Sequence, residues 1–337
     1  SWTSDPLTAV ALDLLGGDGA PEVVVEAIAE VARSTDPAGE LLDIVLVGPA
    51  DQADPLLRAR GLHDRVRVVE AGRAAPMDAD PLGILRDADD VTVCVGMDLL
   101  ASGSADAFVS AGHTGATVAA AVLRLGRMPG VARAALAVVI PALAGPVVLL
   151  DAGAAPDASP ESLLHNALAG WAYARSLGLR DPAVGLLTIG SEAGKGDQLR
   201  RSAHELLAAS LGSAGIPYAG PVEGHDVSAG QVAQIVVTDG FTGNVLLKGL
   251  EGAVRWCALQ MGAAYADPGP ARAVARATAT SDFAGGLVLG VNGVVVAGHG
   301  AGTPDEVAAC IRLAAKAARG GVLAGTRDAL ASVRVPA

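Results

Sequence analysis

A short apolar run, Ile235–Val237, ends in a polar turn that holds residues suited to chemistry. Asp239 and Asn244 stand in this turn, beside Gly240 and Gly243. In open α/β sheets, ligands bind where the carboxyl ends of strands hand over to helices, and glycine lets the backbone approach a ligand closely. Asn244 could therefore donate to a ligand oxygen, and Asp239 could orient a base or a lysine. The competing interpretations are a helix cap for Asn244 and a hydrogen bond within the turn for Asp239.

Four further apolar runs end in turns of the same kind, which span residues 13–19, 110–116, 151–154 and 188–196. Because the carboxyl ends of parallel strands meet at one edge of a sheet, the five turns predict one active-site rim. The residues in them that we expect to bind substrate are Gly16, Gly17, Asp18, Ser110, Gly112, Thr114, Gly115, Gly153, Gly240 and Gly243.

Two of these turns carry a side chain that could act directly on a substrate. His113 lies in a glycine-rich turn, where it could serve as a general base near neutral pH, or could be a neutral change at an unused position. Lys195 lies between two glycines, where it could steer an anion or simply be a solvated surface lysine. Ser110 and His113 do not make a hydrolase triad, because the Gly-x-Ser-x-Gly turn is absent.

Composition limits the class of protein. The 337 residues are 51% hydrophobic and 18% charged, which supports a large core, and the net charge of −12 argues against a general nucleic-acid surface. Cys94, Cys257 and Cys310 lack the spacing of metal ligands, so we expect no metal and three buried thiols in a reducing cytoplasm. We expect neither a signal peptide nor a membrane-spanning run, and we expect residues 1–6 to be a disordered or foreign lead.

Alternating elements predict an α/β protein with a mainly parallel sheet and a single domain over residues 7–330. We expect strands over 44–48, 66–70, 135–140, where Pro141 ends the strand, and 231–237, and a β-turn-β element over 285–300. We expect helices over 115–126, 160–178, 197–211, 245–264, 272–279 and 304–319, and a helical stretch with a break near 87–90 over 82–102. Ser159 and Thr303, each followed by proline, are the clearest N-caps.

The order of these turns resembles the PlsX-type phosphate acyltransferase family over nearly the whole chain. The segments that carry the resemblance are 12–18 with 20–22, 105–112 with 114–116, 185–187, 195–196, 222–224, 238–248 and 298–300. The resemblance adds Glu223 and Lys248 to the expected substrate-binding residues, and His113, Lys195, Asp239 and Asn244 would be catalytic. It implies a homodimer with a Rossmann-like three-layer α/β/α fold related to isocitrate and isopropylmalate dehydrogenases. It also implies acyl transfer from acyl carrier protein to inorganic phosphate, without a cofactor. The turn Gly16–Gly19 lacks the dinucleotide pattern, so NAD is not expected.

Several positions depart from the family pattern. The family has Asn where His113 and Ala155 stand, a lysine-rich segment with two serines where 86–90 stand, and two serines where Ala301 and Gly302 stand. Losing these phosphate ligands predicts weaker use of phosphate, and leaves an amine, an alcohol or water as the acceptor of a specialised enzyme.

Acyl-CoA is an alternative donor, and a catalytically inactive scaffold that binds carrier protein is the alternative function. An acidic carrier protein would need an arginine patch, for which the candidates are Arg124, Arg127, Arg133, Arg272 and Arg276. The apolar hairpin by which the family touches membrane is cut short between Tyr265 and Phe283, so membrane association is doubtful.

Overall fold

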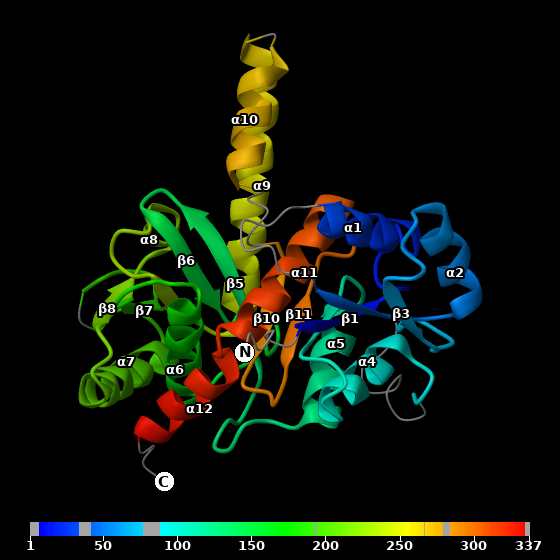
Figure 1. Cartoon of the computed structure of the whole chain (residues 1–337). Helices are drawn as coiled ribbons and strands as arrows, with labels where there is room; N and C mark the ends of the chain where they lie inside the picture. The colour runs from blue at the N-terminus through cyan, green and yellow to red at the C-terminus, as the bar shows by residue number, and fades with distance from the viewer. Residues whose placement is uncertain are drawn as a thin grey trace, which may run out of the picture. The chain divides into compact units, whose positions relative to one another are not determined.

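The computed structural model describes residues 7–33, 42–76, 88–192, 194–265, 267–278 and 284–333 (Figure 1). The leading segment 1–6 lies outside this range. The chain forms two compact units, the first made of 1–128 and 284–323, and the second of 129–283 and 324–337. The expectation of a single domain stays a prediction.

A six-stranded layer forms the centre of the first unit. Its strands, in spatial order, are β3 (Val66–Val69), β2 (Asp43–Val47), β1 (Ala9–Asp13), β4 (Ala107–Ser110), β11 (Val294–Ala297) and β10 (Gly286–Leu289). Neighbours pair in parallel except β10 and β11, which form the predicted β-turn-β element. The strands are short, apolar and rich in β-branched residues, as strands covered on both faces require.

Helices cover both faces of this layer. On one face α1 (Glu22–Arg33) packs against α11 (Pro304–Arg319), and on the other α4 (Thr92–Ala101) packs against α5 (Thr114–Ala120) and its continuation η2 (Ala121–Leu125) (Figure 1). The short α2 (Ala50–Ala59) lies beside α1 and β3. Thr303 caps α11 as predicted, because its hydroxyl accepts from the backbone N–H of Glu306, whose carboxylate in turn accepts from the Thr303 N–H.

The second unit has the strand order β5 (Ala135–Ala142), β6 (Gly145–Leu150), β9 (Ile235–Val237), β7 (Val184–Leu187) and β8 (Tyr218–Val222). All neighbours are parallel except β5 and β6, which form a hairpin. On one face lie α6 (Pro160–Ser176) and α7 (Gln198–Leu211), which continues into η3 (Gly212–Ala214). On the other lie α8 (Gly224–Ala229) and the start of α9 (Gly240–Tyr265). The last helix, α12 (Val322–Ser332), follows α11 in the chain.

Helix α9 begins immediately after β9. Leu246, Leu247 and Leu250 pack against a buried cluster that includes Val147 and Val236, and this contact holds the start of the helix on the sheet. Beyond this contact α9 pairs with α10 (Pro268–Thr278), and the two run side by side as a helical hairpin (Figure 1). In the described part of the chain, no helix is both long and apolar enough to cross a membrane.

Several expectations about elements were wrong. Strand β5 does not stop at Pro141 but continues to Ala142, because Pro141 faces Pro146 and neither residue has an N–H to lose from the ladder. The helix expected over 82–102 begins only at Thr92, with residues 77–87 outside the described range. Strand β9 begins at Ile235, not at residue 231. Cys94 and Cys310 are buried as expected, but Cys257 is exposed on α9.

Candidate active site

In the first unit, the turns after β1 and β4 are locked together around a buried carboxylate. The hydroxyl of Ser110 donates to Asp13 Oδ2 at 2.7 Å, and the backbone N–H groups of Leu15 and Gly112 donate to Asp13 Oδ1 and Ser110 Oγ at 3.0 and 3.1 Å. Gly16 lies so close to this group that an added Cβ would stand 2.8 Å from Asp13 Oδ2. Burial raises the pKa of Asp13, and the hydrogen bond from Ser110 offsets part of the rise.

His113 closes the second of these turns as the N-cap of α5. Its Nδ1 accepts from the backbone N–H of Ala116 at 3.3 Å. A neutral imidazole that accepts at Nδ1 carries its proton at Nε2, so the ring offers a donor toward solvent or substrate. In this arrangement His113 is suited to binding a carbonyl or phosphate oxygen. The general-base role stays a prediction, and it would require the cap to be released or the tautomer to change.

A cavity of about 190 Å³ lies over these two turns. Asp13, Asp18, Gly112 and His113 contribute its polar wall. The remaining wall is apolar or glycine, and no lysine or arginine of the described residues lines it. The structure therefore brings together five predicted residues of the first unit, Gly16, Gly17, Asp18, Gly112 and His113, in one wall. Thr114 and Gly115 follow as the first residues of α5.

In the second unit, the turn after β6 is organised by Asp151. Its buried carboxylate accepts from four backbone N–H groups, those of Leu136, Gly153, Ala154 and Ala155, at 2.7–3.0 Å. Burial raises the pKa of Asp151 in spite of these donors. Such a fully bonded carboxylate holds the turn in shape and has little capacity left for a ligand.

The first turn of α9 packs directly on the turn that Asp151 organises. An added Cβ on Gly243 would stand 1.9 Å from the carbonyl oxygen of Asp151, and one on Gly240 would stand 2.4 Å from that of Ala155. Gly240 also donates its N–H to Ala155 at 2.9 Å, and Asn244 Nδ2 donates to the carbonyl of Ala152 at 3.1 Å. Both glycines therefore allow close backbone packing, and Asn244 holds the adjacent turn.

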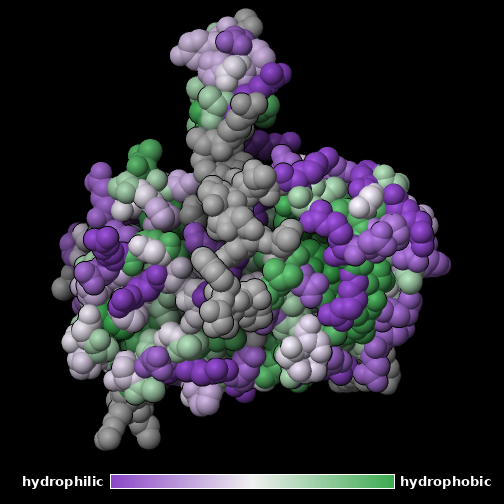
Figure 2. All heavy atoms as spheres, viewed as in Figure 1, coloured by the Kyte–Doolittle hydropathy of each residue, from purple (hydrophilic) through white to green (hydrophobic). Residues whose placement is uncertain are grey.

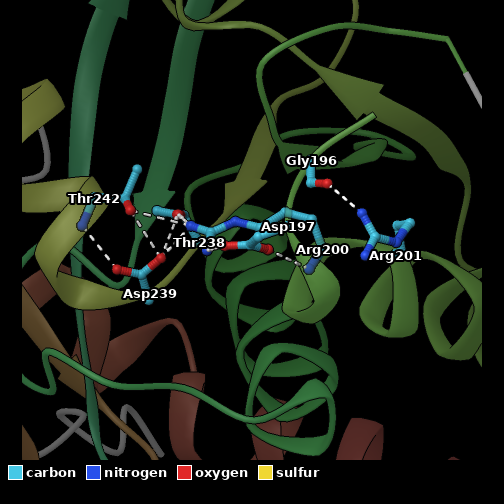
Figure 3. A network of polar contacts seen from close by, with 7 residues as sticks. All are labelled: Gly196, Asp197, Arg200, Arg201, Thr238, Asp239 and Thr242. Atoms are coloured by element: carbon cyan, nitrogen blue, oxygen red, sulfur yellow. Dashed lines mark hydrogen bonds and ion pairs between the residues drawn. The ribbon is translucent and has the colours of Figure 1, made fainter. Parts of the chain in front are cut away.

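Asp239 binds an arginine that the sequence analysis did not single out. Arg200, from the first turn of α7, donates to Asp239, Thr238 and Thr242, and its other nitrogen pairs with Asp197 Oδ2 at 2.9 Å (Figure 3). Thr242 donates to Asp239 through its backbone N–H and its hydroxyl, both at 2.8 Å. Burial alone would raise the pKa of Asp239, but the hydrogen bonds from Thr242 and the charge of Arg200 together hold it below its usual range.

The remaining predicted residues have more ordinary surroundings. Lys195 is exposed in the loop before α7, with no ion-pair partner among the described residues. Lys248 pairs with Glu251 at 2.8 Å on the surface of α9. Glu223 precedes α8 and donates its backbone N–H to Asp226 at 2.9 Å. Gly153, with a φ of 137°, occupies a backbone conformation that favours glycine.

The acidic residues that replace the family's lysine-rich segment are paired where they are described. Asp89 forms an ion pair with Arg124 and Asp90 with Arg73, each at 2.9 Å. An arginine therefore offsets part of the charge of each, which weakens the electrostatic reason for expecting poor phosphate use. Arg124 also pairs with Asp98, so it is a poor member of a carrier-protein patch. Arg133 and Arg272 remain exposed, and the side chain of Arg276 lies outside the described residues.

Comparisons with known proteins place the chain in a family. The profile of the family described as "Fatty acid synthesis protein" matches residues 8–324. A phosphate acyltransferase of Thermobifida fusca is 42% identical over 90% of this chain and 86% of its own length. One of Desulfitobacterium hafniense is 36% identical over 93% of this chain and 95% of its own.

Solved structures with the same fold are more distant in sequence. The EutD phosphotransacetylase of Staphylococcus aureus is 16% identical, with a TM-score of 0.63 over 93% of this chain and 94% of its own. The 4-hydroxythreonine-4-phosphate dehydrogenase of Klebsiella pneumoniae is also 16% identical, with a TM-score of 0.53 over 94% and 99%. These likenesses confirm the predicted Rossmann-like α/β fold with a mainly parallel sheet. The chain belongs to the fatty acid synthesis protein family, the family of the PlsX-type phosphate acyltransferases, and is an acyltransferase.

Proposed function

We propose that this acyltransferase moves a fatty acyl group from a thioester to inorganic phosphate, with acyl carrier protein as the expected donor and CoA as the alternative. A phosphate oxygen attacks the thioester carbonyl carbon, a C–O bond forms, and the C–S bond then breaks to release the thiol, which takes up a proton. The observation that carries the proposal is the 36–42% identity to phosphate acyltransferases over nine-tenths of the chain.

Lys195 and His113 are suited to different tasks in this reaction. Lys195 in the second unit is an exposed cation in a glycine-flanked loop, suited to holding phosphate. His113 in the first unit presents an N–H donor, suited to the carbonyl oxygen that gains charge during attack.

The function is tested by offering acyl carrier protein and CoA thioesters together with phosphate, an amine or water. Thiol release and the acylated product are followed by mass spectrometry. We expect acyl phosphate at ordinary millimolar phosphate. Product formed only with the amine or water would instead support the changed acceptor that the sequence departures predict. A protein that binds carrier protein but consumes neither donor would be the scaffold.

A separate experiment tests Lys195. The chain has only three lysines, so another lysine can serve as the control. We expect Lys195→Gln to raise KM for phosphate about 10- to 100-fold, the equivalent of one charge-assisted hydrogen bond. Lys316→Gln, on the surface of α11, should change nothing. An unchanged KM for phosphate in Lys195→Gln would remove Lys195 from the site.

The variant His113→Asn tests both the general-base role of His113 and the chemical nature of the acceptor. Asn also caps helices, so the variant keeps the fold of the turn while it removes the imidazole ring. If His113 is a donor, the rate with phosphate should be largely retained, whereas His113→Ala should lose activity. A selective loss of transfer to neutral nucleophiles in His113→Asn would favour the general base.

A further inference from the structure

The cavity of the first unit has both polar and apolar lining residues, and binding of phosphate as the acceptor would not account for the apolar ones. Ala74, Ala75, Pro76 and Val93 form an apolar part of the lining, in addition to the turns of Asp13 and His113. Ala75 and Val93 are buried, and Ala74 is half-buried. The wall is built from two separate parts of the chain, the segment after β3 and the start of α4.

The electrostatics of this cavity oppose an anion. Asp13 and Asp18 contribute two carboxylates to the lining, and no lysine or arginine of the described residues joins them there. Phosphate would have to give up its hydration beside the carboxylate of Asp18, without a compensating cation among the described residues of the lining. The ligand that fits is neutral, with an apolar part and a hydrogen-bond acceptor that meets the imidazole.

We propose that this cavity takes the acyl group of the thioester, with the alkyl chain against the wall of Ala74, Ala75 and Val93 and the carbonyl oxygen toward Nε2 of His113. The inference rests on the proposed function and assigns the acyl donor's reacting end to a defined place. An apolar cavity of about 150 Å³ holds benzene, so about 190 Å³ accepts several carbons of an alkyl chain next to the carbonyl.

The small size of the wall residues makes them determinants of acyl-chain preference. Each methylene that is buried or excluded is worth about a fourfold change in relative kcat/KM. Ala74→Leu narrows the cavity from its half-buried edge, so it should shift preference toward shorter chains. Val93→Ala removes two methyl groups from the wall and should shift preference toward longer chains. Opposite shifts are a signature that loss of stability cannot produce.

The experiment measures kcat/KM for a series of saturated acyl thioesters of increasing length, with phosphate as acceptor. The wild type is compared with Ala74→Leu and Val93→Ala. The matched controls are Ala50→Leu, at the half-buried start of α2, and Val25→Ala, in the buried face of α1. We expect the optimum to move in opposite directions in the two cavity variants, with ratios between chain lengths changed at least about fourfold per methylene, and to stay fixed in both controls.

Two results would overturn the assignment. One is a change in kcat/KM that is the same for all chain lengths in both cavity variants. The other is a shift of the optimal chain length that is no larger than in the controls. Should Val93→Ala fail to fold, Ala74→Leu alone still decides, because its side chain lies at the edge of the cavity. Failure of the proposed function would give a different result, because the wild type would then form no acyl phosphate from any donor.

Discussion

Asp13 is a carboxylate buried beneath the turns that carry His113 and Gly16, and its ionisation opposes folding. Because burial raises its pKa above the unfolded value, its favourable contribution to stability is present at pH values below the unfolded pKa. That contribution is lost as pH rises through the raised pKa. We expect the wild type to lose stability relative to Asp13→Asn as pH rises from the acidic side through this window. Urea unfolding at a series of pH values measures the difference, and parallel curves for the two proteins would contradict it.

Arg200 is the cation that compensates the buried charge of Asp239. Their side chains are only 12% and 9% exposed. Removal of one partner leaves an uncompensated charge, so Arg200→Gln should cost about 3–5 kcal/mol of stability. Adding Asp239→Asn should recover most of this loss. Arg201→Gln serves as the control, because this exposed neighbour donates only to the carbonyl of Gly196 among the described contacts, and its loss should cost no more than about 1 kcal/mol. Equal losses for Arg200→Gln and Arg201→Gln in denaturant unfolding would show that the network contributes little.

Arg200 also shows where residue patterns stop being informative. Asp239, Gly240 and Asn244 could be predicted as a functional turn because they stand next to one another after an apolar strand. Arg200 lies 39 positions before Asp239, in a helix of ordinary polar composition. Only the parallel placement of β7 beside β9 brings the starts of their following helices together. No local spacing encodes that contact.

At the scale of elements, the glycines of α9 determine how closely this helix approaches the turn after β6. Gly243→Ala would place its Cβ 1.9 Å from the carbonyl of Asp151, and backbone on both sides leaves little room to move. We expect a loss of several kcal/mol, on the scale of overpacking or more, and disturbed kinetics. Gly212→Ala is the control, because it lies in a helical conformation with no atom within 4 Å and should be neutral or slightly stabilising. Comparable thermal unfolding of the two variants would refute the close approach.

Long periodic elements and capped helix starts could be predicted, and short or unusual ones could not. Ser159 and Thr303 are capping residues that act within one turn of chain, so their helices begin as expected. Strand β8 escaped prediction because Gly220 and Pro221 stand inside it, which only an edge strand tolerates. Helix α12 has neither a strong N-cap residue nor a clear helical spacing of apolar residues, so the sequence gives little from which to predict it.

At the scale of the whole molecule, the expected homodimer rests on the surface of α9. Val245, Trp256 and Leu259 are 59–64% exposed, and Gly249 and Gly252 stand between them at alternating spacings of three and four residues. Such spacing places the five on one stripe, as in the seam of paired helices. Figure 2 shows hydrophobic and hydrophilic residues mixed on the visible face of the α9–α10 hairpin. An exposed apolar stripe of this kind favours association with another copy of the chain.

We therefore expect the protein to sediment as a dimer and the double variant Trp256→Glu/Leu259→Glu to sediment as a monomer, because two charges would enter the seam of each chain. Leu143→Glu is the matched control. Leu143 is 92% exposed at the tip of the β5–β6 hairpin, away from this stripe in sequence and element, so its substitution should leave the dimer intact. Sedimentation velocity over a range of concentrations separates the outcomes. A monomeric wild type would refute the dimer, and a dimer that survives the double variant but not Leu143→Glu would move the interface to the hairpin tip.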